Sequence, residues 1–474
     1  MAVRTSAAFS TEWSSMRKLL SAQHVTVCAG SRSWRRRDAW PTTSVGWIEV
    51  QVLVDEVFKI ESDCRTCGSS DLLPVLDLGD QPPANSLRSD PAEDLVAVPL
   101  NLVFCGTCRV AQLTATVDPV ELFARYVWVT GTAQATRDYS HKFRDQIVTA
   151  HGDSGDANRF LVEVASNDGT FLRRFQEVGW KVLGVDPAQN IVDEAVTSGV
   201  PTRCDFFDLG VAEEIEREHG PADVVVARNV IPHVKAIRSI MEGIAALIGN
   251  RGIAAIEFHS ANRIVEELHY DSIYHEHLFY FSLTTLSELC GRFGLVAFAV
   301  FDSPISGGSR VLLLSAGWKK ETEGLRVGLK EEADSGVCDY ETWKRFGEAS
   351  KRHAAALATC VRERAVRGPV VGYGASARSS TMLNFAGIDV SLVSAVIDQN
   401  PSKQGLYTPG TDIPVVTRPE GLSLLGDKGS ILLLAWNFAD EILGGLRSDG
   451  VGCDVMVPLP GDVRTIRGDD EWRS

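Results

Sequence analysis

Residues 160–172, FLVEVASNDGTFL, decide the fold of this chain. The apolar-rich run at their start predicts a buried strand, and the polar turn after it leads into a helix-like segment. Gly169 permits a close turn, and the first turn of the following helix offers backbone N–H groups with no partner inside the helix. A turn that admits a pyrophosphate has glycines where Ala165, Ser166 and Asn167 stand here, so a dinucleotide fits this turn poorly.

Strand-like and helix-like segments alternate outward from this stretch as far as about residue 317. The apolar runs at 181–186, 222–227 and 252–258 are short, and most are followed by a longer segment with a polar pattern. This alternation predicts an α/β fold in which crossover helices connect the parallel strands of a doubly wound sheet.

The ends of the predicted strands carry residues that suit a nucleoside. Asp186 ends the second strand, seventeen residues after Gly169, where its carboxylate can accept both hydroxyls of a ribose. Asp205 and Phe206 follow, where a hydrogen bond and stacking can hold an adenine. In this order the features predict S-adenosylmethionine on a Rossmann-like class I methyltransferase fold. The expected contacts are Glu163, Ala165, Ser166, Asn167, Gly169, Asp186, Pro187, Asp205, Phe206 and Asn229.

The size and composition of the chain are typical of a multi-domain globular enzyme. Its 474 residues exceed one ordinary core, and 44% are hydrophobic and 23% charged. The net charge of −15 argues against a nucleic-acid partner. No apolar run reaches the length of about eighteen residues that a membrane span needs. We therefore expect a cytoplasmic protein with no membrane partner, and the sequence predicts no oligomeric state.

Changes in pattern divide the chain into five segments. Residues 1–57 contain the run Arg35-Arg36-Arg37 and no sustained period, so we expect a disordered leader, with a transit peptide as the alternative. The remaining boundaries predict a zinc-binding module over 58–150, a methyltransferase domain over 151–318, a helical connector over 319–367 and a second Rossmann-like domain over 368–474.

Four of the ten cysteines form two CxxC pairs, Cys64 with Cys67 and Cys105 with Cys108. Each pair adjoins a tight turn that can direct two thiolates to one point, and four thiolates complete the tetrahedral coordination of zinc. A site of this kind has no open position, so the predicted zinc ion is structural. A redox-active CxxC and coincidence are the alternatives, and two pairs within one short block disfavour both.

The last segment repeats the strand-turn-helix pattern in GYGASARSS, residues 372–380. Gly374 and Ser376 open a helix whose N-terminal N–H groups can receive a phosphate. Asp398 ends the next strand 24 residues after Gly374, as in a dinucleotide site, but the turn lacks the third glycine of GxGxxG. A dehydrogenase-like domain is therefore the weaker interpretation.

Several long motifs make the chain similar to a known family. It resembles the sugar C-methyltransferases of antibiotic deoxysugar pathways in EVASNDG, GVDPAQN, ARNVIPHV, YDSIYHEHLFYFSL, ISGGSR, GYGASARSSTMLNFAGI, DQNPSKQGLYTPGTDIP and WNFADEI. The resemblance runs from about Cys64 to the C-terminus. It implies methyl transfer from S-adenosylmethionine to a ring carbon, usually C3 and sometimes C5, of a nucleotide-linked 4-keto-6-deoxyhexose.

The resemblance also implies where this small-molecule substrate binds. It assigns the nucleotide diphosphate to the C-terminal domain and makes the zinc module an independent lid or substrate wall. Arg228 and the turn around Arg378 depart from the usual family pattern. The expected substrate contacts are Tyr126, Arg310, Gly374, Ser376, Arg378 and Lys403.

Methylation at carbon requires a base, because the donor methyl group accepts electrons and the acceptor carbon must first become an enolate. Histidine suits this task, since its pKa lies near neutrality. The resemblance favours His277 as the base, with Glu276 and Tyr274 orienting the substrate or stabilising the enolate. If this segment is extended, His275 shares a face with His277 and Tyr274 shares one with Glu276.

Other interpretations of these residues stay open at this point. The sequence HEH also fits a metal-binding fragment or a structural hydrogen-bonded cluster. His233 is expected with Asn229 at the carboxyl edge of the sheet, where ligands bind, but a packing role is equally compatible. For the whole chain the alternatives are a methyltransferase for a non-sugar natural product, a nucleotide-sugar oxidoreductase that uses the C-terminal domain, and a catalytically silent binding protein.

Overall fold

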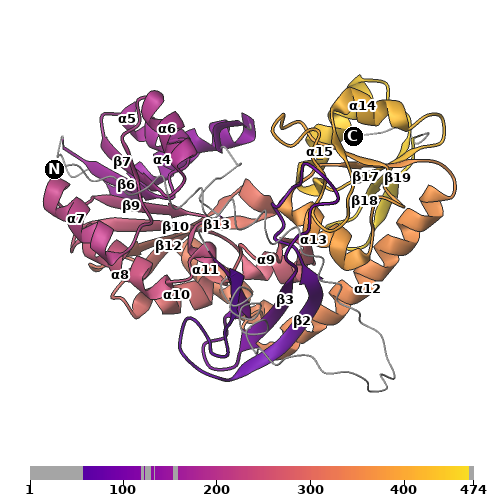
Figure 1. The fold of residues 1–474 in the computed structure, drawn as a ribbon. Helices are drawn as coiled ribbons and strands as arrows, with labels where there is room; N and C mark the ends of the chain where they lie inside the picture. The colour runs from indigo at the N-terminus through magenta and orange to yellow at the C-terminus, as the bar shows by residue number, and fades with distance from the viewer. Residues whose placement is uncertain (1–56, 119–121, 123–129, 133, 153–157, 469–474) are drawn as a thin grey trace, which may run out of the picture. The chain divides into compact units, whose positions relative to one another are not determined.

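The computed structural model describes residues 57–118, 122, 130–132, 134–152 and 158–468 (Figure 1). The predicted leader, apart from Val57, and the predicted substrate contact Tyr126 lie outside these residues. The described residues form sheets of seven, six, four and two strands.

The seven-stranded sheet has the order β12-β13-β10-β9-β6-β7-β8. Its strands are parallel except β13, which pairs antiparallel with both β10 and β12. This order with one reversed strand is that of the class I methyltransferase fold, so the predicted fold is confirmed. The strands are β6 (Phe160–Val164), β7 (Lys181–Asp186), β8 (Thr202–Cys204), β9 (Val224–Arg228), β10 (Ile253–His259), β12 (Val296–Ser303) and β13 (Ser309–Ser315).

Helices cover both faces of this sheet because alternate strand residues point to opposite sides. Val162 and Val225 join one hydrophobic cluster with α7 and α8, whereas Leu161 and Val224 join another with α4 and α5. The strand order reverses between β6 and β9, and the carboxyl edge at such a point is where ligands bind. The helices are α4 (Gln134–His151), α5 (Thr170–Gln176), α6 (Gln189–Thr197), α7 (Leu209–His219), α8 (Ile237–Ile248), α9 (Ala261–Glu266) and α10 (Leu283–Gly291), with the short turns η1 (Thr130–Thr132), η2 (Ile231–His233), η3 (Tyr270–Ser272) and η4 (Ile305–Gly307).

The cysteine-containing module is built on an antiparallel sheet of the order β11-β4-β3-β2. Strand β11 begins one residue after YHEH and belongs to the segment that the resemblance makes catalytic; the role of the module as a lid or substrate wall stays a prediction. Backbone pairing between β11 and β4 makes the module continuous with that segment. The strands are β2 (Leu72–Gln81), β3 (Val98–Cys105), β4 (Ala111–Leu113) and β11 (Phe279–Tyr280), beside a ribbon of β1 (Phe58–Ile60) and β5 (Ala115–Val117).

Two helices, α11 (Glu323–Ser335) and α12 (Tyr340–Ala365), occupy the predicted connector. The following sheet has the order β16-β15-β14-β17-β18-β19, parallel except for β19, which confirms the predicted second Rossmann-like unit. Its elements are β14 (Val370–Tyr373), α13 (Ala377–Ala386), β15 (Ala395–Ile397), β16 (Val415–Val416), α14 (Arg418–Leu424), β17 (Ser430–Leu433), η5 (Trp436–Phe438), α15 (Ala439–Ser448), β18 (Asp454–Val457) and β19 (Arg464–Ile466).

One hydrophobic cluster crosses the predicted domain boundaries. It contains Leu100 of the cysteine-containing module, Tyr270 near the YHEH segment, Leu357 of α12 and Val371 of the C-terminal sheet. Across the described residues, no helix combines the length and apolar character of a membrane span.

Candidate functional site

The turn after β6 has a strained backbone. Ala165, Asn167 and Gly169 have φ angles of 53°, 52° and 74°, a left-handed region that costs a non-glycine residue about 1–3 kcal/mol. A β carbon on Gly169 would lie 2.8 Å from Cγ1 of Val200, so both its φ and the available space require glycine. The Asn167 side chain accepts a hydrogen bond from the Thr130 N–H at 2.8 Å. Strain of this kind is concentrated at functional sites, which agrees with the donor site predicted here.

Asp186 lies at the carboxyl end of β7, where its carboxylate accepts the N–H groups of Asn167 and Ala188, both at 3.0 Å. Burial raises the pKa of this carboxyl, and the two hydrogen bonds oppose that change. Each oxygen keeps a further lone pair, so the carboxylate can still accept the ribose hydroxyls predicted for Asp186. Asp205 adjoins this edge and donates its N–H to the Asp186 carbonyl at 3.1 Å, while its carboxylate pairs with Arg203 at 2.8 Å.

The remaining residues predicted to contact the nucleoside lie near the same edge of the sheet. Phe206 is 48% exposed, so one face of its ring is available for stacking. Pro187 directly follows Asp186, and its carbonyl lies 3.6 Å from the Cys204 thiol, which connects the ends of β7 and β8. The buried Ser166 hydroxyl has no hydrogen-bond partner among the described residues, which suits a contact to a ligand.

Arg228, the last residue of β9, is a largely buried cation. Its guanidinium lies 2.8 Å from Glu257, 3.5 Å from Glu163 and 3.1 Å above the Phe171 ring. Burial raises the pKa of Glu163 to about 8, and the charge of Arg228 opposes this rise. The next residue, Asn229, has a φ of 50° and donates its N–H to the Glu257 carbonyl. The departure from the family pattern at Arg228 therefore stabilises two buried carboxyls.

YHEH forms a turn, so the expected extended pairing of its side chains is wrong. The His277 N–H donates to the Tyr274 carbonyl at 2.8 Å, which closes the turn and places Tyr274 beside His277. His277 Nδ1 lies 3.0 Å from the Ser272 carbonyl, an acceptor that requires the proton on Nδ1. Its Nε2 is therefore the acceptor for the Tyr274 hydroxyl at 2.8 Å. His275 points elsewhere and lies 3.0 Å from the Val98 carbonyl of β3.

Three further groups surround His277. The His233 ring meets the His277 ring edge-on at a centroid distance of 4.6 Å, and His233 also bonds to the backbones of Asn229 and Glu276. Burial, together with His233 and His259, holds the pKa of His277 well below its usual range. Burial lowers the pKa of His233 to about 4 and raises that of Glu276 to about 7. Both imidazoles are therefore neutral near pH 7.

The predicted phosphate contacts of the C-terminal unit all have partners within the protein. Arg378 forms a fork with Asp271, with both N···O distances at 3.0 Å, and lies over the Trp436 ring. Ser376 caps α13, and Lys403 donates to the Ala375 carbonyl at 2.7 Å. These contacts leave the predicted phosphate roles as predictions.

Gly374 and Arg310, two further predicted substrate contacts, also have close neighbours within the protein. Gly374 has a φ of 102° where the chain passes Ala435 closely. Arg310 lies 2.9 Å from Glu331 and 3.4 Å from Asp302, beside a cavity of 280 Å³.

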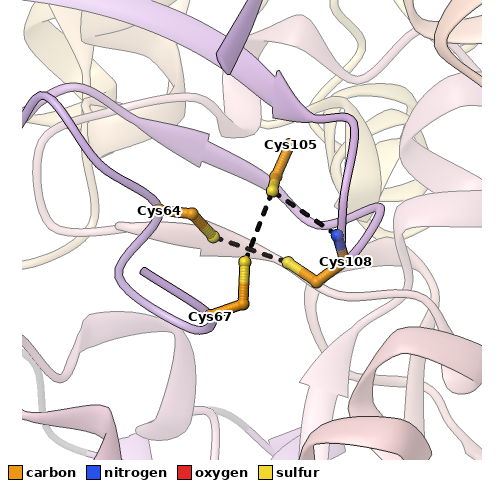
Figure 2. A group of neighbouring side chains, drawn as sticks. All are labelled: Cys64, Cys67, Cys105 and Cys108. Atoms are coloured by element: carbon orange, nitrogen blue, oxygen red, sulfur yellow. Dashed lines mark hydrogen bonds between the residues drawn. The ribbon is translucent and has the colours of Figure 1, made fainter. Parts of the chain in front are cut away.

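The four predicted zinc ligands converge (Figure 2). The Sγ atoms of Cys64, Cys67, Cys105 and Cys108 all lie within 4.8 Å of one another. Cys64 and Cys108 are separated by 3.5 Å and Cys67 and Cys105 by 3.6 Å. Zinc–sulfur bonds of about 2.3 Å in a tetrahedron place the sulfurs roughly 3.8 Å apart. The cluster therefore fits zinc, with no position left for a substrate.

Sequence reasoning missed three residues that contact the YHEH turn or its support. Asn85 donates a hydrogen bond to the Glu276 carboxylate. Asp271, which precedes the turn in the sequence, accepts one from the Trp436 indole. Asn85 and Asp271 lie in the motifs QPPANSL and YDSIYHEH, but nothing in their spacing indicates contacts to residues so distant along the chain.

Models of three protein families match the chain in succession. One described as "Putative zinc binding domain" matches residues 64–123, one described as "Methyltransferase domain" matches 135–300, and one described as "C-methyltransferase C-terminal domain" matches 304–460. The last description, unlike the fold, specifies that the methyl group goes to carbon.

The chain is 31% identical to C-methyltransferase NovU of Streptomyces niveus over 414 residues, which cover 86% of this chain and 97% of that protein. Among solved structures, magnesium protoporphyrin IX methyltransferase of Synechocystis is 13% identical, with a TM-score of 0.29, over 39% of this chain and 85% of that one. A methyltransferase of Archaeoglobus fulgidus is 11% identical, with a TM-score of 0.31, over 38% and 94%. This chain therefore belongs to the S-adenosylmethionine-dependent C-methyltransferases that combine an N-terminal zinc-binding module, a class I methyltransferase fold and a C-terminal Rossmann-like unit.

Proposed function

We propose that this enzyme methylates a ring carbon of a nucleotide-linked 4-keto-6-deoxyhexose, with C3 favoured over C5. The observation that carries the proposal is the hydrogen-bonded pair of Tyr274 and His277. Its histidine is neutral and presents a proton-accepting Nε2, as enolisation beside a ketone requires. The sugar class is supported by the motifs that resemble deoxysugar C-methyltransferases and by the relationship to C-methyltransferase NovU.

In the proposed reaction His277 Nε2 removes the proton from the carbon beside the ketone. The Ser272 carbonyl keeps the other ring nitrogen protonated and fixes the ring, so the accepting atom cannot change. The Tyr274 hydroxyl leaves Nε2 as the proton arrives and donates instead to the developing enolate oxygen. Glu276 orients the sugar, and the nearby His233 ring restricts the movement of the base.

S-adenosylmethionine supplies the electrophilic methyl group that the enolate carbon attacks. We propose that Asp186 holds its ribose, Phe206 and Asp205 its adenine, and the strained 165–169 turn its amino-acid end. Zinc, held by the four cysteines, ties the two ends of its module together and takes no part in the reaction. Ser376, Lys403, Arg310 and Arg378 are the proposed contacts of the nucleotide diphosphate.

The test is incubation with S-adenosylmethionine and dTDP-4-keto-6-deoxyglucose in deuterated water, with the product analysed by mass spectrometry. We expect the gain of one methyl group in the product, whose methylated carbon keeps no hydrogen, and deuterium at the same carbon in the recovered unmethylated sugar. Deuterium without a methyl group would identify a working base and a different hexose, such as one deoxygenated at C2. Absence of both changes would refute this sugar class and favour a non-sugar acceptor.

Replacement of the base separates catalysis from binding. We expect His277→Ala to bind S-adenosylmethionine normally and to lose turnover by at least about 10²-fold, because positioned general bases contribute roughly 10²–10⁴-fold. His141→Ala is the matched control, since His141 is exposed on α4. Full activity in His277→Ala would contradict the assignment of the base.

A further inference from the structure

Asn85 brings a side chain of the cysteine-containing module to the YHEH turn. Its Nδ2 donates to Oε1 of Glu276 at 2.6 Å, across 191 positions of sequence. The Glu276 side chain is only 4% exposed. A carboxyl so far removed from water depends strongly on its few hydrogen-bond donors.

The loop that carries Asn85 is held by its own backbone. Within it, the Leu87 N–H donates to the Asn85 carbonyl at 2.9 Å. Just beyond, Arg88 and Tyr407 exchange backbone hydrogen bonds of 3.1 and 2.8 Å, and the Arg88 guanidinium pairs with Asp412. The described contacts of the loop therefore stay in place when the Asn85 amide is removed.

The YHEH turn, which carries the acceptor Glu276, is also held by contacts to the module. His275 Nε2 lies 3.0 Å from the Val98 carbonyl, and Leu113 donates its N–H to the Leu278 carbonyl at 3.0 Å. The backbone of the turn is thus fixed to the module on both sides of Glu276. What the backbone does not determine is the direction of the Glu276 carboxyl.

We propose that Asn85 is a positioning residue that fixes the orientation and protonation of the Glu276 carboxyl, and so couples the zinc-binding module to the reacting centre. This inference rests on the proposed function, in which Glu276 orients the acceptor. Asn85 acts through Glu276, so its effect disappears when the Glu276 side chain is truncated to that of alanine.

Within the part of the chain that the structure describes, no neighbouring charge shifts the pKa of Glu276 as this amide does. Among the described residues, the titratable groups around Glu276 are Tyr274 and His277 on its own turn and His233 from η2, and both imidazoles are neutral near pH 7. Burial raises the pKa of Glu276, and the Asn85 hydrogen bond lowers it. Removal of the amide therefore moves the pKa of Glu276 upward.

The first measurement needs no acceptor. Infrared titration of the folded protein, with Glu276→Gln subtracted, isolates the carboxyl band of Glu276. In Asn85→Ala we expect the midpoint of that titration to move up by about 1–2 pH units, which is the scale of one hydrogen bond to a charged group. An unchanged midpoint would overturn the proposal even if the enzyme proves to use another substrate.

The second measurement is a double-mutant cycle on methyl transfer. We expect Asn85→Ala to lower kcat about 10–100-fold, to leave the KM for S-adenosylmethionine within twofold, and to have less than a twofold further effect in the Glu276→Ala background. Additive losses would show that Asn85 acts by another route and would refute the coupling. Asn250→Ala, at an exposed turn, is the control, and thermal unfolding checks that the variants fold.

The two measurements distinguish this inference from the proposed function. If the wild-type protein transfers no methyl group to the nucleotide sugar, the proposed function fails, while the infrared midpoint still tests the contact between Asn85 and Glu276. If methyl transfer occurs but the midpoint does not move, the positioning role alone fails.

Discussion

Arg378→Ala removes one half of a buried ion pair that supports the proposed catalytic turn. The Asp271 side chain is fully buried and accepts both arms of the Arg378 fork at 3.0 Å. The next residue, Ser272, supplies the carbonyl that fixes the His277 ring. Loss of the guanidinium leaves the Asp271 charge buried; among the described residues Trp436 is its remaining side-chain donor, at 2.8 Å.

The expected loss of stability is about 3 kcal/mol. Breaking a buried pair by removal of one partner costs roughly 3–5 kcal/mol, because the other charge stays desolvated. The lower end applies here, since the Arg378 side chain is 15% exposed and the Trp436 hydrogen bond survives. Arg378→Lys keeps a charge but loses the fork, so we expect a smaller loss.

Urea unfolding of the apoprotein, followed by circular dichroism, measures this loss. Arg238→Ala is the matched control: its partner Glu242 lies 3.4 Å away on the same helix and Arg238 is 75% exposed, so we expect a change below about 0.5 kcal/mol. A stability of Arg378→Ala equal to that of this control, combined with a raised KM for the nucleotide sugar, would refute the reasoning. Arg378 would then contact the phosphate, as proposed, without supporting the turn.

Three other changes test separate parts of the structure. Asp186→Asn should weaken S-adenosylmethionine binding by about tenfold or more in titration calorimetry, because a charged acceptor for the ribose becomes neutral; unaltered affinity would exclude Asp186 from the donor site. Cys105→Ser should lower the zinc content measured by atomic emission from one ion per chain and reduce the melting temperature, whereas Cys360→Ser should change neither. Folding raises the pKa of Glu276 from 4.5 to about 7, so stability from the neutral carboxyl is present below pH 4.5 and lost as the pH rises through 7. Glu276→Gln should therefore lose less stability than the wild type over that interval, and parallel stability curves would contradict the raised pKa.

Much of the framework was predictable because it depends on local pattern. Apolar runs at 160–165 and 181–186 became β6 and β7, and the two CxxC pairs converged as their spacing indicated. The position of Asp186 at a strand end follows from where the apolar run stops. Such features depend on residues that lie close together in the sequence, so the sequence alone can indicate them.

The arrangement around the proposed base was not predictable in this way. Extended geometry would group His275 with His277, whereas the turn closed by the His277 N–H pairs His277 with Tyr274. The partners that decide the environment of the turn, Asn85 and Arg378, approach from segments on either side of it in the sequence. The residues next to His277 in the sequence do not indicate partners that come from so far along the chain.

The sequence alone predicted the strand and turn of a methyltransferase fold, a four-cysteine cluster and a second α/β unit, because hydrophobic period, turn residues and ligand spacing act over short distances. Only the tertiary structure decided which nitrogen of His277 accepts a proton, which carboxyl is held by Asn85, and that β11 completes the sheet of the cysteine-containing module. The physical reason is that hydrogen-bond direction, desolvation and sheet pairing depend on groups brought together by folding across hundreds of positions.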